Sequence, residues 1–540
     1  MTSATTVFTG RAWCPVQGDL DAVAVRDGRV VAVGAEARAH LAGDAAREVE
    51  VGDGIVLPAF ADGHAHPLFG GLEAEGPQVR RQDSVEGIVA EVARWAAEHP
   101  DEPWVLGASY DSSLAPEGLF DAHWLDAAVP DRPVVLRAWD YHTVWVNSVA
   151  LERAGLDADT PDPVLGEVPR REDGSPLGTL REWGAVDLVM EHVAPRPLEV
   201  RVRAVERATR HLAGLGITWV QDAWAEAADV EAWLAASEQR RLHCAVNLAL
   251  YADPRRGLGQ VEQLVALRRR VRAHGDPLLT AETVKLFADG VVENATAALL
   301  EPYTGPECAH TGMLVWEPDA LAEVVTAVDA VGFQPHLHTI GDRAVRAALD
   351  AVEAAVRANG ARDDRRPVLA HVQLIAEEDR PRLVDLGVVA NAEPLWAQLD
   401  ALMEVLTAPR LGEPRSSQQY PWATLSALGA RLSFGSDWPV SSADPLEGIA
   451  VACSRQTEHR LPAGGWTPHE RLSLEAALRA YTAGTAHQAG RAAGTLRPGD
   501  DADLVRLDRD PFTLAAPRDL DTVRVTHTWL RGRLAHGPTP

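Results

Sequence analysis

The sequence predicts an α/β protein: a (β/α)8 barrel of the TIM type, with a small β-sandwich domain formed by both termini and a subdomain inserted after the first barrel strand. Strand-like and helix-like segments alternate through the middle of the chain, strand patterns cluster at both ends, and one long stretch interrupts the alternation. We expect residues 1–57 and 494–540 to form the terminal domain, 58–493 the barrel, and 70–200 the insertion.

The terminal domain is predicted from matching strand patterns at the two ends of the chain. Residues 21–34 alternate apolar and polar side chains around Asp27-Gly28, a signal for a two-residue hairpin. Residues 501–508 and 523–537 alternate in the same way. Short strands at both ends therefore predict one β domain assembled from both termini.

The barrel is predicted from eight strand-like segments, most of them followed by Ala-, Leu-, Glu- and Arg-rich helical stretches. The eight segments are 54–66, 216–224, 241–250, 282–290, 332–342, 366–375, 387–395 and 430–440. An open doubly wound sheet is the alternative, but no GxGxxG motif follows the first segment, which weighs against a dinucleotide-binding version of it. The interval 70–200 is too long for a loop, so we expect it to fold as a subdomain over the barrel mouth.

Composition limits the partners of the protein. The 540 residues carry a formal net charge of -27, which argues against nucleic acid and anionic membranes, because both require a basic face. We find no signal peptide and no apolar run of membrane length. The four cysteines form no CxxC motif and fit reduced thiols. We expect a cytoplasmic protein that binds a small molecule, with a homodimer left open.

Metal-type side chains gather where a barrel would place its active site, at the carboxyl ends of the strands. His64 and His66 end the first predicted strand, and their i, i+2 spacing puts both imidazoles on one face. Other strand ends contribute His336 and His338, His371, and Asp437. One HxH alone is weak evidence, but histidines and an aspartate at four strand ends suit zinc or a related divalent ion.

Lys285 is the only lysine in the chain. Its neighbours Val284, Leu286 and Phe287 are apolar, so it is expected in a buried strand. A lysine amine can lose its proton when buried, whereas guanidinium stays charged, so arginine could not replace it in amine chemistry. The alternative is a coding bias toward arginine that left one lysine by chance.

Seven segments, in order, resemble the amidohydrolase superfamily, and more narrowly its YtcJ-like branch, amidohydrolase family 3, which includes N-substituted formamide deformylase. They are 56–66, 284–290, 338–345, 369–375, 434–440, 477–486 and 494–511. The resemblance covers nearly the whole chain. One segment departs from the family pattern: 288–303, ADGVVENATAALLEPY, which we expect to line the pocket, so that relatives' substrates do not transfer.

The resemblance implies a ligand set and a mechanism. The implied metal ligands are His64, His66, Lys285, His338, His371 and Asp437. Lys285 would be carboxylated and bridge two ions, although a single zinc beside an unmodified lysine stays open. Asp437, His338 and Lys285 are the expected catalytic residues, with Asp437 moving the proton from the attacking water to the leaving amine.

Further residues are expected around the substrate. His142 matches a family histidine and could contact the substrate carbonyl, and His336 could contact substrate; each could instead be a packed histidine. Asp222 could hold a ligand histidine or cap a helix. Tryptophans near strand ends or in the insertion could form an aromatic pocket or pack the core. They are Trp139, Trp145, Trp224, Trp396 and Trp438. Of these, we expect Trp396 and Trp438 to contact the substrate.

The expected reaction is hydrolysis of a non-peptide C–N bond of amide, formamide or carbamate type. Two alternatives remain open from the sequence: a metal-assisted isomerase or decarboxylase on the same scaffold, and a small-molecule binding protein without activity. The complete ligand set argues against the second, since a relict site would have lost members.

Overall fold

The computed structural model describes residues 4–43, 46–304 and 310–539. At its centre is an eight-stranded parallel sheet in the order β17-β16-β15-β14-β13-β12-β11-β6. The strands are β6 (Phe60–Ala65), β11 (Ile217–Ala225), β12 (Ala245–Tyr251), β13 (Leu279–Phe287), β14 (Gln334–Thr339), β15 (Val368–His371), β16 (Val389–Ala392) and β17 (Arg431–Phe434). Each lies within or overlaps one of the eight predicted segments, so the predicted (β/α)8 barrel is confirmed.

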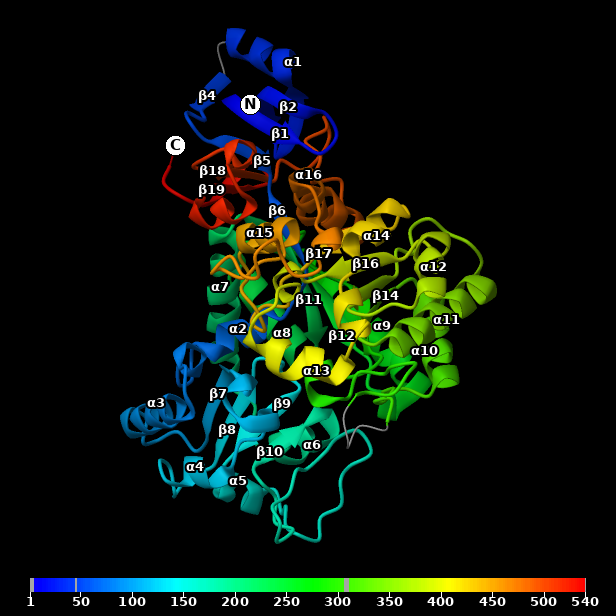
Figure 1. Ribbon diagram of the computed structural model, residues 1–540. Coiled ribbons are helices and arrows are strands. Elements are labelled where there is room, and N and C mark those ends of the chain that lie inside the picture. The colour runs from blue at the N-terminus through cyan, green and yellow to red at the C-terminus, as the bar shows by residue number, and fades with distance from the viewer. Residues whose placement is uncertain (1–3, 44–45, 305–309, 540) are drawn as a thin grey trace.

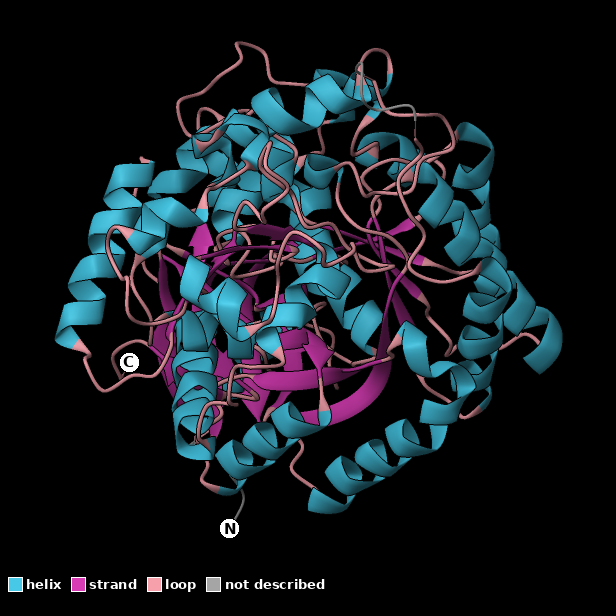
Figure 2. Cartoon of the chain, turned by 90° about the horizontal axis from the view of Figure 1, so that it is seen from below, coloured by secondary structure: helices cyan, strands magenta, loops and turns pink. Residues whose placement is uncertain are grey.

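Helices follow the strands and lie around the barrel (Figure 2). They are α7 (Leu198–Gly214), α8 (Ala227–Glu238), α9 (Val261–His274), α10 (Pro318–Ala330), α11 (Asp342–Asn359), α12 (Arg380–Asp385), α14 (Trp422–Ala427) and α15 (Pro445–Ser454). The helix α11 shows why such segments are helical: its apolar residues recur every three to four positions, and the face that includes Val345, Leu349 and Val352 is buried.

Hydrogen bonds join the two ends of the barrel sheet beside the predicted metal residues. The Asp437 amide donates to the His64 carbonyl at 2.7 Å, and the His66 amide donates to the Trp438 carbonyl at 2.7 Å. The buried Asp62 carboxylate accepts from the Ser436 amide at 3.0 Å and from its hydroxyl at 2.5 Å. The first and last strands are therefore held together at the level of the candidate site.

Both chain ends build a second eight-stranded sheet, above the barrel in Figure 1. Its strands are β1 (Thr5–Cys14), β2 (Gly18–Arg26), β3 (Arg29–Val33), β4 (Ala46–Glu50), β5 (Ile55–Pro58), β18 (Leu504–Leu507), β19 (Val525–Leu530) and β20 (Arg533–His536). Asp27 and Gly28 have φ angles of 52° and 75° in the predicted hairpin. Hydrogen bonds connect all eight strands, and the sheet folds over so that Phe8 of β1 meets Trp529 of β19 at 4.8 Å, although two strands separate them in the sheet order; the domain predicted from both termini is confirmed.

The chain between β6 and α7 forms its own layer at the opposite end of the barrel (Figure 1). Four strands pair in the order β10-β9-β8-β7: β7 (Val105–Tyr110), β8 (Val134–Ala138), β9 (Thr143–Val146) and β10 (Thr179–Arg181). The helices are α2 (Pro67–Glu73), α3 (Val85–Glu98), α4 (Ala122–Asp126), α5 (Ser148–Arg153) and α6 (Glu182–Met190). Two buried apolar clusters stabilise this layer.

Two further observations bear on the expectations from composition. In the ranges 4–43, 46–304 and 310–539, no helix combines the length and the apolar character needed to cross a membrane. Cys14, Cys244 and Cys453 are free thiols, as expected, whereas Cys308 lies outside the described residues.

Candidate active site

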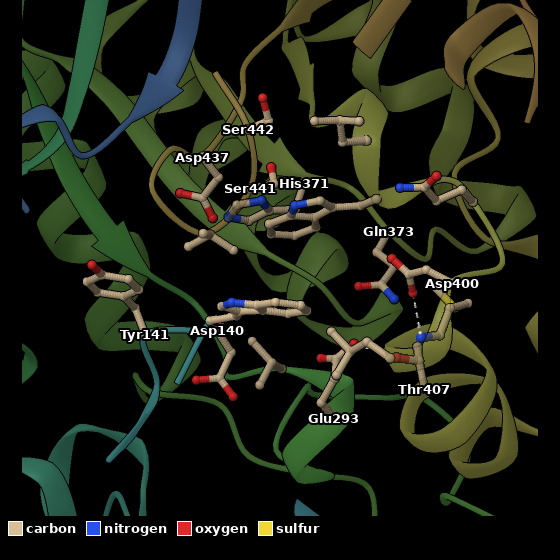
Figure 3. A pocket seen from close by; sticks show the side chains of 18 of the residues that line it. Asp140, Tyr141, Glu293, His371, Gln373, Asp400, Thr407, Asp437, Ser441 and Ser442 are labelled. Atoms are coloured by element: carbon tan, nitrogen blue, oxygen red, sulfur yellow. Dashed lines mark hydrogen bonds between the residues drawn. The ribbon is translucent and has the colours of Figure 1, made fainter. Parts of the chain in front are cut away.

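The six predicted metal residues come together at the carboxyl ends of the barrel strands. They line one cavity of about 830 Å³, which is also walled by residues of the insertion (Figure 3). The six are His64, His66, Lys285, His338, His371 and Asp437. The period-two alternation of the strands turns His64, Lys285 and His338 inward, and because parallel strands end at the same rim, His66 and Asp437, which follow their strands, reach the same place.

A trio within this group is arranged for a metal ion. Asp437 Oδ1 lies 3.0 Å from His66 Nε2 and 3.5 Å from His64 Nε2. This oxygen is buried and makes no hydrogen bond within the described residues. His64, His66 and Asp437 can each offer one ligand atom, and these atoms lie within 4.8 Å of one another. A buried carboxylate oxygen with two imidazole nitrogens beside it fits a divalent ion such as zinc.

Burial keeps the histidines of the site neutral, which is the state that binds metal. Desolvation lowers the pKa of His371 to about 3. The same cause holds the pKa of His64 and of His338 well below the usual 6.5, with Lys285 and His371 adding repulsion at His64. Within this pocket the unprotonated nitrogens are therefore available as ligands.

Three of the metal-binding histidines have one ring nitrogen fixed by a protein group. His371 Nδ1 lies 2.9 Å from Glu393 Oε2, His338 Nε2 lies 3.1 Å from the Gly290 carbonyl, and His64 Nδ1 lies 2.8 Å from His336 Nε2. These contacts set the orientation and tautomer of the rings and leave the other nitrogen of each toward the pocket. Sequence reasoning missed Glu393, although its place near the carboxyl end of the seventh predicted segment, 387–395, was a usable signal.

Lys285 is fully buried in β13, with Nζ 3.4 Å from His64 Nε2 and 4.5 Å from the centre of the Phe287 ring. Burial lowers the pKa of Lys285 to about 7, although Asp437 and Glu393 act in the opposite direction. An amine with this pKa is partly uncharged at neutral pH. The only lysine of the chain thus lies at the site, and in its uncharged form its amine nitrogen can act as a ligand or a nucleophile.

His336 does not contact substrate space, which corrects one expectation. Its side chain is fully buried and does not line the cavity, and its Nε2 meets His64 Nδ1 at 2.8 Å. His336 and His338 share a face of β14, but His336 lies two residues deeper in the barrel, about 6.6 Å along the strand. Its contact with Nδ1 helps to fix the orientation of the His64 ring.

Two further expectations are also wrong. The Trp438 ring packs against α2, so close to Gly70 that a Cβ atom there would clash with it, and against His211, so it does not line the cavity. Among the described residues Asp222 has no hydrogen bond to a ligand histidine; its Oδ2 accepts from the Trp233 indole at 2.9 Å. This contact ties β11 to α8.

His142 enters the cavity from the insertion. Its ring centre lies 5.3 Å from that of His338, and its Nδ1 lies 2.8 Å from Glu182 Oε2. Burial disfavours the charged imidazolium, but Glu182 outweighs this effect and raises the pKa of His142. Glu182 is buried with φ 62°, and Thr296 donates to its other oxygen, so the carboxylate is firmly held. Sequence reasoning missed Glu182.

Aromatic side chains form much of the remaining wall. Trp139, Trp224 and Trp396 line the cavity, and the Trp396 ring stacks on His371 at 5.0 Å. Trp145 instead is buried in the core of the insertion, which corrects its inclusion in the aromatic pocket. Trp183 was not named as a pocket residue, although it lies within the predicted insertion 70–200; its ring meets Trp224 edge to face at 4.3 Å.

Barrel fold and site together define a class: a metal-dependent barrel enzyme whose ligands project from the carboxyl ends of the strands. Residues 47–536 match the model of the Amidohydrolase family, so the chain belongs to this family and is a hydrolase. The resemblance stated from the sequence is thereby confirmed.

Known proteins similar to this chain agree in length and fold. YtcJ of Bacillus subtilis (strain 168) is 27% identical, covering 96% of this chain and 97% of its own length. The N-substituted formamide deformylase of Arthrobacter pascens is 27% identical, covering 96% and 95%. The crystal structure of an uncharacterized metal-dependent hydrolase from Pyrococcus furiosus superposes with a TM-score of 0.71 at 25% identity, covering 94% of this chain and all of that chain.

Proposed function

We propose that this hydrolase cleaves a non-peptide C–N bond of amide, formamide or carbamate type in a small molecule, with bound zinc. The observation that carries the proposal is the buried Asp437 Oδ1, which lacks a hydrogen bond within the described residues and faces two imidazole nitrogens on the wall of a large cavity. The similarity to an N-substituted formamide deformylase supports the bond type.

His64, His66 and Asp437 would hold the ion, with His338 and His371 as further ligands. A divalent ion bound there supplies Lewis-acid activation of water and of the substrate carbonyl. The uncharged Lys285 amine can add CO2, forming an N–C bond and releasing one proton to solvent, which would give a carboxylated lysine able to bridge two ions. The same set of residues is also compatible with a single ion beside an unmodified Lys285.

The chain's own groups then perform the proton transfers. Asp437 accepts the proton of the attacking water and returns it to the leaving nitrogen, so that a C–O bond forms, the C–N bond breaks, and a carboxylate and an amine leave. His142 faces the site from the opposite wall, where it can hydrogen-bond to the substrate carbonyl oxygen. The aromatic walls exclude bulk water around the reacting carbon.

Metal content and product release test the proposal. Protein purified without added metal or chelator should contain one or two zinc ions per chain by plasma mass spectrometry. A panel of N-substituted formamides, amides and carbamates should include members from which amine is released, with Asp437→Asn reducing the rate at least about 100-fold. Content near zero that added zinc does not restore, or release of amine that survives Asp437→Asn, would overturn the mechanism.

A further inference from the structure

Carboxylates gather on the wall of the active-site cavity away from Asp437 (Figure 3). Glu293 lies in the short helix η6 (Val292–Asn294) after β13, and Asp400 follows the segment that carries Trp396. Thr407 ends the π-helix η9 (Met403–Thr407), an element that is frequent at functional sites. Glu293 also belongs to the segment 288–303, which departs from the family pattern and was expected to line the pocket.

These two carboxylates have no cationic partner among the described residues. Glu293 Oε1 accepts from Thr407 Oγ1 at 2.5 Å, and Asp400 Oδ1 accepts from the Met403 amide at 2.9 Å. The second oxygen of each has no hydrogen bond within the part of the chain that the structure describes. Burial, with a contribution from the Glu293 charge, raises the pKa of Asp400 to about 6. A cation bound between them would offset both desolvation and mutual repulsion.

The rest of the cavity has the same sign of charge. Eight carboxylates and three lysine or arginine side chains line it. Arg80 is paired with Glu73 at 2.8 Å, Arg518 is paired with Asp521 at 2.8 Å, and Lys285 is enclosed among the metal-binding residues. Among the described residues that line the cavity, each lysine or arginine outside the metal-binding group therefore has a carboxylate partner. That the cavity takes a ligand at all rests separately on Asp437, whose buried Oδ1 faces it unpartnered.

We propose that Glu293 and Asp400 form a cation subsite, and that the substrate carries an ammonium or guanidinium group at the end remote from the scissile C–N bond. The inference rests on the proposed function for the position of that bond. Trp396 links the metal-binding residues to the cation subsite, because its ring stacks on His371 and its segment leads to Asp400. An apolar spacer between the scissile bond and the cationic group of the substrate would therefore lie along aromatic walls. A net charge of -27 favours the approach of a cationic substrate.

Three probes that differ only in their tails test the subsite. N-(5-aminopentyl)formamide has a cationic end, N-hexylformamide replaces the ammonium by a methyl group, and N-formyl-6-aminohexanoate is anionic; homologues with shorter spacers cover the unknown length. We expect kcat/KM for the best cationic probe to exceed that of its neutral analogue at least about tenfold, as for one charge-assisted hydrogen bond. The preference should fall as salt is added.

A matched pair of double variants assigns the preference to this wall. Glu293→Gln with Asp400→Asn should reduce the ratio of kcat/KM for the cationic probe to that for the neutral probe to below about threefold. The control, Glu377→Gln with Asp364→Asn, removes the same charge from side chains that are 87% and 74% exposed, and should keep the preference. Equal loss in both double variants would assign the effect to the overall charge and overturn the subsite.

Binding separates this inference from the proposed function. In Asp437→Asn protein, calorimetry should show tighter binding of the cationic probe than of the neutral one. Preferential binding of the cation without turnover in the wild type would support the subsite and contradict the formamide reaction. Turnover of the neutral or anionic probe at an equal or higher rate would leave the hydrolase intact and overturn the subsite. Neither binding nor turnover of any probe would overturn both.

Discussion

At the scale of single residues, Lys285 shows how burial selects a side chain. The position is fully enclosed, and its nitrogen lies 3.4 Å from His64 Nε2. A guanidinium would bring a permanent charge beside a ligand histidine, whereas an amine with a pKa of about 7 can exist uncharged. If Lys285 acts as a metal ligand, as we propose, this chemistry would explain why one lysine is kept in a chain whose other basic side chains of this kind are arginines.

Lys285→Arg should lose metal and activity together, the activity by at least about tenfold, because the buried positive charge repels the ion and cannot be carboxylated. The measurement is zinc per chain together with amine release. Lys285→Ala distinguishes the two roles of the lysine. Added acetate or propionate should partly restore its activity if a carboxylated lysine is the ligand, and should have no effect if the amine itself acts. Full metal content and activity in Lys285→Arg would contradict a role for Lys285 in the site and leave a coding bias toward arginine as the explanation for the single lysine.

At the scale of elements, strand periodicity predicted which side chains point into the barrel but not how deep they lie. His336 and His338 alternate correctly on β14, yet only His338 reaches the cavity. Strand periodicity could not place Trp438, because β17 ends at Phe434 and Asp437 has φ 52°, so that the following residue turns toward α2. Contacts between distant elements, such as that between His142 and Glu182, depend on packing that no local pattern encodes.

Asp222 carries a prediction about the tie between β11 and α8. Burial raises the pKa of its carboxyl well above the usual 3.8. Above pH 3.8 the carboxyl ionises in the unfolded chain but stays protonated in the folded one, so stability falls as pH rises from the unfolded pKa toward the folded pKa. Asp222→Asn keeps an oxygen acceptor for the Trp233 indole and has no carboxyl to ionise.

The Asp222→Asn variant should therefore resemble the wild type at pH 4 and exceed its unfolding free energy at pH 8. The gain follows from the direction of the pKa shift, because only the wild type must ionise or protonate a buried carboxyl between the two pH values. Urea unfolding at the two pH values measures the difference. The matched change Asp19→Asn, at a side chain that is 74% exposed, should leave the pH dependence as it is in the wild type. A variant less stable than the wild type at pH 8 would show that the ionised carboxylate is stabilising.

At the scale of the whole molecule, the sequence predicted the barrel and the domain shared by the termini from their patterns of alternation, and the insertion from the length of the stretch that interrupts the barrel pattern. The continuity of the terminal sheet was not predictable, since β5 pairs with β18 across most of the chain length and no local signal records that pairing. This sheet also contacts the barrel: the Thr528 hydroxyl donates to the Ala213 carbonyl of α7 at 2.7 Å. Both chain ends are thereby linked to the helix that leads into the second barrel strand.

The link between the termini should be measurable through Trp529. Its ring is buried and meets Phe8 edge to face at 4.8 Å, joining β19 to β1. Trp529→Ala should lower the free energy of unfolding by about 3–5 kcal/mol, the usual cost of removing a buried aromatic side chain. Leu534→Ala, at a side chain that is 37% exposed on the edge strand β20, should cost less than about 1 kcal/mol. Circular dichroism during denaturant unfolding compares the two variants. Because the sheet is bonded to α7, we expect one transition in which the barrel unfolds with it; an early transition that leaves amine release unchanged would instead show that the terminal sheet unfolds independently of the barrel.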